Sequence, residues 1–220
     1  ERYVSFNTTV AYPDLIADQI HYNIPENAFI DESGNEYNGL VKMWTRYYDV
    51  TNPMTTIFMP GNLKGVDKSG LPVLLSSYGM FSTELTDLNG REIKLKPGAE
   101  IGILMPLNNS LANSAPQSLP IWHYDESKGK WIEEGVATKV GTKYAFKVSH
   151  FSTWNVDNPY MDFLQFKMRI VDPQGNGISE VFVNLKDKTG GLSGYGVSNS
   201  SGYVTGYMPK NVEIAIYFKT

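Results

Sequence analysis

The feature that most constrains the fold of this chain is the near-absence of helical periodicity along its whole length. Short runs rich in β-branched and aromatic residues, such as "PIWHY" and "TKYAFKV", alternate with clusters of Gly, Asn, Asp and Pro. Runs of this length and spacing are typical of the strands and turns of β-sandwiches. Only "YPDLIADQI" has a pattern that could hold a helical turn or two. We therefore predict an all-β protein made of two consecutive β-sandwich domains.

The segment "NVDNPY" is the predicted boundary between these domains, because Pro159 lacks the backbone N–H that a continuing strand uses. It divides the chain into a first domain, residues 1–158, and a second domain, residues 159–220. The sequence stops within an expected strand, so we expect the second domain to be incomplete. In the first domain, "DESKGK" joins "PIWHY" to "WIEEG" as a hairpin. Aromatic cross-strand pairing predicts that Trp122 and Trp131 contact the strand that holds Phe146.

Composition excludes several classes of function. The chain has 220 residues, of which 41% are hydrophobic and none is cysteine, and its net charge is −4. Disulfide frameworks and thiol chemistry are therefore absent, and nucleic-acid binding through phosphate neutralisation is not expected. No segment reaches the length of a membrane span. The chain begins "ERYVSF", without an initiator Met or a signal peptide, so we expect any targeting segment to have been removed before this numbering starts.

Motifs for cofactors and metals are missing from the sequence. It contains no nucleotide-binding loop, no HExxH and no GxSxG, so we expect no cofactor and no metal. The acidic residues Asp31, Glu32 and Asp172 could bind a cation, but their spacing fits no EF-hand loop. They lie in turn-forming clusters, which favours solvated turns.

Two segments resemble known families. "FKMRIVDPQGNGISEVFVNL" and "SNSSGYVTGYMPKNVEIAIYF" resemble carboxypeptidase regulatory-like domains, which have a transthyretin-like β-sandwich and usually act as spacers or adhesion units. "IPENAFIDESGNEYNG", "PIWHYDESKGKWIEEG" and "YAFKVSHFSTWNVD" resemble ZU5-type and cartilage-intermediate-layer-like extracellular proteins, and surface proteins of the Bacteroidetes type. The resemblance implies a secreted or surface-anchored protein of the cell envelope, with a protein or glycan at the cell surface as its partner.

The resemblance also implies a reaction of the backbone itself. Some ZU5 domains, and the unrelated nucleoporin autoproteolytic domain, cut themselves between the Phe and Ser of His-Phe-Ser. Carried over to this chain, the site consists of His150, Phe151 and Ser152, and the cut lies between Phe151 and Ser152. The serine attacks the preceding carbonyl in an N→O acyl shift, and water then hydrolyses the ester.

Such a cut needs a base and a distorted amide, because amide resonance opposes rotation with a barrier of about 18–20 kcal/mol. His150 suits the role of base, and a backbone N–H, Asn155 or Lys147 could stabilise the oxyanion. A regular strand would bury His150 and Ser152 and expose Phe151. We therefore expect the strand to break between Ser149 and Ser152.

Other interpretations remain open. The segment could be a strand end whose polar groups only bond the turn, in a non-catalytic adhesion or scaffold protein. A carbohydrate-binding accessory module is a third possibility, although Trp122, Trp131 and Trp154 are expected in the core. His123 is expected to be half-exposed and structural, and His21 has no partner that the sequence reveals.

Overall fold

The computed structural model describes residues 3–52, 54–55 and 58–219, and the predicted all-β fold is confirmed. The strands are β1 (Tyr3–Asn7), β2 (Tyr12–Ala17), β3 (Ile20–Ile24), β4 (Phe29–Ile30), β5 (Leu40–Tyr48), β6 (Lys64–Val66), β7 (Pro72–Asp87), β8 (Lys94–Leu95), β9 (Ile101–Pro106), β10 (Ser118–Asp125), β11 (Lys130–Val140), β12 (Lys143–Val148), β13 (Thr153–Tyr160), β14 (Phe163–Arg169), β15 (Phe182–Asp187), β16 (Leu192–Val197), β17 (Tyr203–Pro209) and β18 (Ile214–Lys219). One short helix, α1 (Asn109–Ala112), is described between β9 and β10. No helix in the described part of the chain has the length and apolar character that a membrane span requires.

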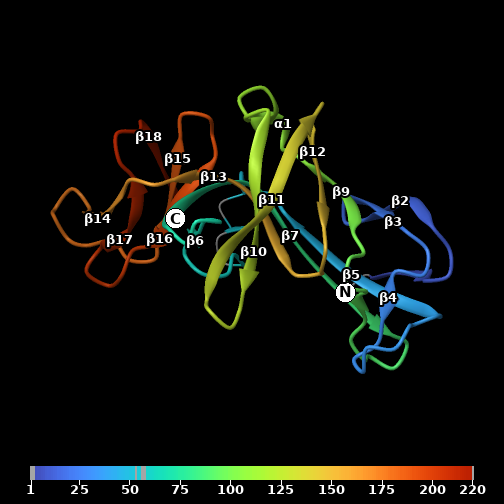
Figure 1. Ribbon diagram of the computed structural model, residues 1–220. Helices are drawn as coiled ribbons and strands as arrows, with labels where there is room; N and C mark the ends of the chain where they lie inside the picture. Colours follow the sequence, from blue (N-terminus) through green and yellow to red (C-terminus); the bar gives the residue numbers. More distant parts are fainter. Residues whose placement is uncertain (1–2, 53, 56–57, 220) are drawn as a thin grey trace.

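Most strands join one large sheet, whose main path runs β18-β15-β16-β7-β13-β10-β11-β12-β9-β3-β2. The long strand β7 also pairs with β5 and β6, so it links the two ends of the molecule. Figure 1 shows the C-terminal strands (orange to red) at one end and the N-terminal strands (blue) at the other. The helical turn that "YPDLIADQI" could hold is not formed, because this segment builds β2 and its turn into β3.

Six turns share one local construction. In each, an Asp or Asn side-chain oxygen accepts hydrogen bonds from the backbone N–H groups two and four residues later. A glycine at the fourth position has φ between 80° and 90°, a region that favours glycine. The six first residues are Asp31, Asp67, Asp87, Asp172, Asp187 and Asn199. The carboxylates of Asp31 and Asp172 are thus engaged by their own turns, as the turn interpretation predicts.

The predicted hairpin is formed by β10 and β11, with Tyr124 opposite Trp131. The indoles of Trp122, Trp131 and Trp154 are buried in the main core, so they offer no exposed platform for a sugar. The indole N–H of Trp122 donates a hydrogen bond to the Asp157 carbonyl oxygen (3.3 Å). The ring of Phe146 lies 6.1 Å from the ring of Phe81 in β7, measured between centroids.

The prediction that Pro159 interrupts a strand is wrong. Strand β13 continues to Tyr160 and pairs Pro159 with Leu75 of β7. The position tolerates proline because Leu75 N–H donates to the Leu63 carbonyl (2.7 Å) and not to β13. On its other side β13 pairs with β10 only at Trp154–Val156, so the missing N–H of Pro159 is not needed.

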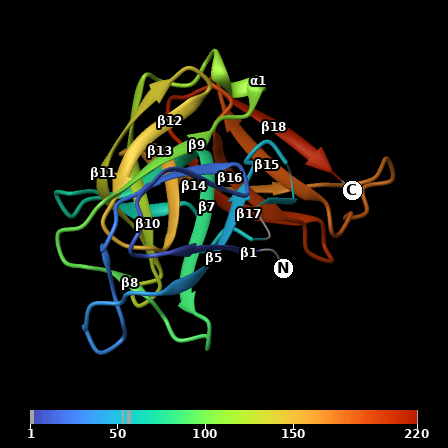
Figure 2. The ribbon, with the colours of Figure 1, turned by 90° about the vertical axis from the view of Figure 1, so that its right-hand side faces the viewer.

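A second, smaller core is built after β13, from Phe166, Val183, Leu185 and Val204. It lies beside the main core, which includes Leu192 of β16. Leu192 pairs with Ser77 of β7, so the large sheet continues from the first unit into the second. Figure 2 shows β18 on the opposite side of the molecule from β11 and β12.

Asp157 is a charged residue type in a fully buried position. Neither carboxylate oxygen has a hydrogen-bond partner among the described residues, and burial raises the pKa of this carboxyl well above its usual range. Its unfolded pKa is about 3.9. The stabilising contribution of the protonated acid is therefore complete below about pH 3.9 and is lost as pH rises through the folded pKa.

Asp157→Asn should remove this pH dependence. We expect the free energy of unfolding of the variant, relative to that of the parent, to rise as pH increases from about 4 to about 8. Urea unfolding at several pH values measures the difference. The exposed Asp162→Asn serves as control, with a change of about 0.5 kcal/mol or less. A constant difference across this range would contradict the assignment.

Candidate functional site

The segment of residues 149–152 is a crossover between two strands that are not neighbours. It leaves β12 and enters β13, and β10 and β11 lie between these two in the sheet. The chain bends at Ser149 and His150 and again at Ser152. The predicted break in the strand between Ser149 and Ser152 is therefore present.

His150 is held by a carboxylate and not by the serine. Its Nε2 lies 3.0 Å from Oε2 of Glu134, and its Nδ1 lies 3.5 Å from the carbonyl oxygen of Phe151. The hydrogen bond with Glu134 raises the pKa of His150. The same contacts keep the pKa of the Glu134 carboxyl well below its usual range, with the His123 contact as the largest cause. His150 is thus oriented by Glu134, with its second nitrogen facing the peptide bond that the sequence singled out.

Ser152 contacts two neighbouring strands, β10 and β7. Its Oγ lies 3.5 Å from the Tyr124 carbonyl oxygen, and its own carbonyl accepts a hydrogen bond from Thr83 N–H (3.1 Å). Phe151 packs against the main core. None of the residues 149–152 has a positive φ. The backbone here therefore shows no left-handed strain that would weaken the amide.

The two side chains named as oxyanion donors have other surroundings. Lys147 Nζ pairs with Glu100 (2.9 Å) at the surface. Asn155 is buried in β13, where its Oδ1 accepts from Ser77 Oγ (3.1 Å). His21, which had no visible partner in the sequence, contacts Asp14 through Nδ1 and Lys143 through Nε2, each at 2.7 Å.

Glu134 is the residue of the candidate site that sequence reasoning missed. The pairing register between β10 and β11 shifts by one residue, since Ile121 faces Gly135 whereas Trp122 faces Glu133. Glu134 is therefore the extra residue of a β-bulge in β11. A bulge re-aims a side chain. Here the Glu134 carboxylate reaches Ser149 Oγ (2.9 Å) as well as His150. The pair of glutamates in "WIEEG" is the only sequence signal that could have drawn attention to it.

His123 completes this group. Its Nδ1 lies 2.9 Å from Glu134 Oε2, but the contact is not aligned as a hydrogen bond, and this buried nitrogen has no other partner among the described residues. Its ring meets the His150 ring edge-on, with centroids 4.8 Å apart. The ring of His150 also lies 4.8 Å from that of Trp154. Both histidines and Glu134 therefore form one cluster over Trp154.

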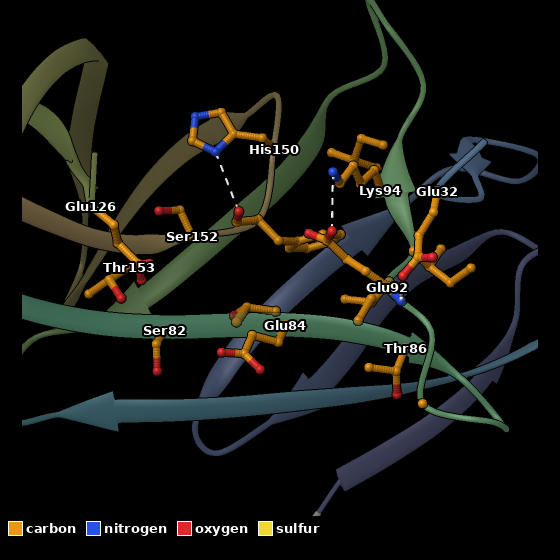
Figure 3. Close-up of a pocket in the computed structure, with 16 residues that line it drawn as sticks. Glu32, Ser82, Glu84, Thr86, Glu92, Lys94, Glu126, His150, Ser152 and Thr153 are labelled. Atoms are coloured by element: carbon orange, nitrogen blue, oxygen red, sulfur yellow. Dashed lines mark hydrogen bonds and ion pairs between the residues drawn. The ribbon is translucent and has the colours of Figure 1, made fainter. Parts of the chain in front are cut away.

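The other side of the crossover lines a polar cavity of about 600 Å³. Figure 3 shows Ser152 and Thr153 near Glu126, and β7 contributes Ser82, Glu84 and Thr86. Glu32, Glu92 and Lys94 close the far end (Figure 3). Acidic groups outnumber basic ones in this lining.

Comparison with known proteins gives one distant relation. The chain is 28% identical over 115 residues to cartilage intermediate layer protein 1 of Sus scrofa, a match that covers 51% of this chain. The chain spans 18% of the length of that relative. No family model and no solved structure matches the chain. About half of the chain is thus similar to a protein named for the intermediate layer of cartilage, which confirms the cartilage-intermediate-layer resemblance at this level.

Proposed function

We propose that this chain is a non-catalytic structural segment of a secreted protein, in which two β-rich modules meet at the end of β13 through a rigid joint. Similarity to cartilage intermediate layer protein 1 supports the extracellular location. The modules hold loops in a fixed orientation toward a cell-surface or matrix partner. In this proposal the first module is a ZU5-type domain and the second is a carboxypeptidase regulatory-like domain.

The observation that carries the proposal is the buried hydrogen-bond network at the joint. Asp187 Oδ2 accepts from Ser76 Oγ of β7 (2.6 Å) and from Tyr160 OH of β13 (3.0 Å). Its Oδ1 accepts from the backbone N–H groups of Thr189 (2.9 Å) and Gly191 (3.1 Å). Asp187 is 3% exposed, so its carboxylate depends on these protein donors and not on water. A flexible linker between independent modules would not need a polar network of this kind.

A second candidate function is self-cleavage between Phe151 and Ser152, and one contact favours it. His150 Nδ1 is 3.5 Å from the Phe151 carbonyl oxygen. When protonated, this nitrogen is placed to polarise the carbonyl, so His150 would act on the oxyanion and not as the base. Ser152 Oγ bonds to the Phe151 carbonyl carbon, and the bond from that carbon to the Ser152 nitrogen breaks. The hydroxyl proton passes to this leaving nitrogen, which becomes an amine, and water then hydrolyses the ester.

Intact mass under denaturing conditions distinguishes the two functions. The structural proposal predicts one species with the mass of the whole 220-residue chain. Self-cleavage predicts two fragments, residues 1–151 and 152–220. Their masses added together exceed the mass of the intact chain by one water molecule.

If fragments are found, Ser152→Ala should abolish them and Ser152→Thr should retain part of the reaction, because threonine keeps the hydroxyl. His150→Ala should slow the reaction by about 10²–10³-fold, since it removes one oxyanion donor. The exposed Ser69→Ala is the matched control and should cleave normally. Fragments in the parent protein would reject the non-catalytic proposal.

A further inference from the structure

The cluster of His123, Glu134 and His150 has the composition of a metal site. One ligand atom from each residue, two imidazole nitrogens and a carboxylate oxygen, lie within 4.8 Å of one another. Two histidines and a glutamate with one open position form a ligand set that suits Zn²⁺. Zinc holds such atoms at about 2.0–2.2 Å, which places them roughly 3.3–3.6 Å apart around a tetrahedron. Small rotations of the three side chains would bring their ligand atoms from the present spacing to the spacing around zinc.

We propose that His123 Nδ1, Glu134 Oε2 and His150 Nε2 bind a Zn²⁺ ion, which ties the crossover of residues 149–152 to the β10–β11 hairpin. The first support is the unsatisfied nitrogen. His123 Nδ1 is buried and points at Glu134 Oε2 from 2.9 Å without the alignment of a hydrogen bond. A cation between these atoms gives the nitrogen lone pair and the carboxylate a common partner.

The second support is the set of groups that surround the ligands. A metal-binding histidine usually donates its other ring N–H to a carbonyl or a carboxylate, and a metal-binding carboxylate is itself hydrogen-bonded. His150 Nδ1 faces the Phe151 carbonyl oxygen (3.5 Å). Glu134 Oε1 accepts from Ser149 Oγ (2.9 Å), which leaves Oε2 for the ion. Both outer contacts required for the proposed ligand atoms are therefore present.

The third support is the rigidity and access of the site. His123 lies in a strand paired on both sides, by β11 and by β13. Glu134 is fixed by the bulge, and Trp154 packs beneath both imidazoles. The His150 side chain is 40% exposed, so an ion and its fourth ligand, a water molecule, can enter from solvent. This inference is independent of whether the chain cleaves itself.

Titration calorimetry of the whole chain tests the proposal after treatment with a chelator. We expect one Zn²⁺ per chain, and no comparable binding of Mg²⁺ or Ca²⁺, which prefer oxygen ligands. His123→Ala and His150→Ala should each weaken binding by at least about 10-fold, and Glu134→Gln should do the same while keeping the shape of the side chain. The chain contains three histidines, so His21→Ala is the matched control and should bind normally.

Nuclear magnetic resonance of the imidazole groups gives a readout that needs no variant. Added Zn²⁺ should shift the ring signals of His123 and His150 together, and leave those of His21 in place. Circular dichroism establishes that each variant is folded. The proposal is overturned if the parent chain binds no zinc, if Ca²⁺ binds instead, or if the affinity for zinc is unchanged in His123→Ala and His150→Ala.

Discussion

Replacement of Asp187 with alanine is expected to lower the free energy of unfolding by about 3–5 kcal/mol, because several donors lose one common acceptor. The change leaves the hydroxyls of Ser76 and Tyr160 without their acceptor in the joint. It also frees the part-buried backbone N–H of Thr189 and the buried backbone N–H of Gly191. Each buried donor without a partner costs about 1–3 kcal/mol.

Asp172→Ala is the matched control for this experiment. Asp172 opens a turn of the same construction and accepts from Gln174 N–H (2.9 Å) and Asn176 N–H (2.8 Å), but these hydrogen bonds lie at the exposed surface. Water can replace these bonds, so the loss should be about 1 kcal/mol. Urea unfolding followed by tryptophan fluorescence measures both variants. Equal losses in the two variants would mean that the turn, and not the joint, accounts for the importance of Asp187.

The parent protein should also unfold in one cooperative transition, because the sheet and this network couple its two cores. In Asp187→Ala the smaller core should melt before the larger one. Two separate transitions in the parent protein would contradict the rigid joint and hence the structural function that we propose.

Replacement of Gly177 with alanine is expected to cost about 3 kcal/mol or more and to unfold the smaller core selectively. A Cβ atom at this position would lie 2.2 Å from the Ser201 carbonyl oxygen and 2.7 Å from the Gly202 nitrogen. Both are backbone atoms of a neighbouring turn, which is fixed because Ile170 N–H donates to the Gly202 carbonyl (2.8 Å). Overpacking against side chains costs about 1–3 kcal/mol, and a backbone cannot swing aside as a side chain does.

Gly175→Ala in the same turn separates this clash from backbone strain. Gly175 has φ of 88°, and no atom lies within 4 Å of the place that a methyl group would take there. Alanine at this position therefore meets strain alone, about 1–2 kcal/mol. Thermal unfolding of both variants and of the parent tests whether Gly177→Ala loses more stability than Gly175→Ala. A smaller loss at Gly177 than at Gly175 would show that the two turns do not pack as closely as the structure has them.

Local sequence determined much of the fold. Alternating apolar residues and Asp-x-x-Gly turns act over a few residues, so they predicted the all-β class and the β10–β11 hairpin correctly. The hairpin in the segment "YPDLIADQI" was not predicted. Its turn uses Asp18 and Gln19, both with positive φ, whereas Asn-Gly is the usual sequence signal for such a turn. Asp18 is held there by a distant strand, since its Oδ2 accepts from Tyr47 N–H (2.7 Å).

The candidate site was also determined partly by local sequence and partly by tertiary structure. The sequence by itself determined that the strand breaks after Ser149 and that His150 and Ser152 lie in the break, because the alternation of apolar residues fails there. Only the tertiary structure decided that His150 faces Glu134 and His123. Those three residues meet through a β-bulge and through a crossover between strands that are not adjacent. Register and strand order depend on the packing of the whole sheet, and no short stretch of sequence encodes them.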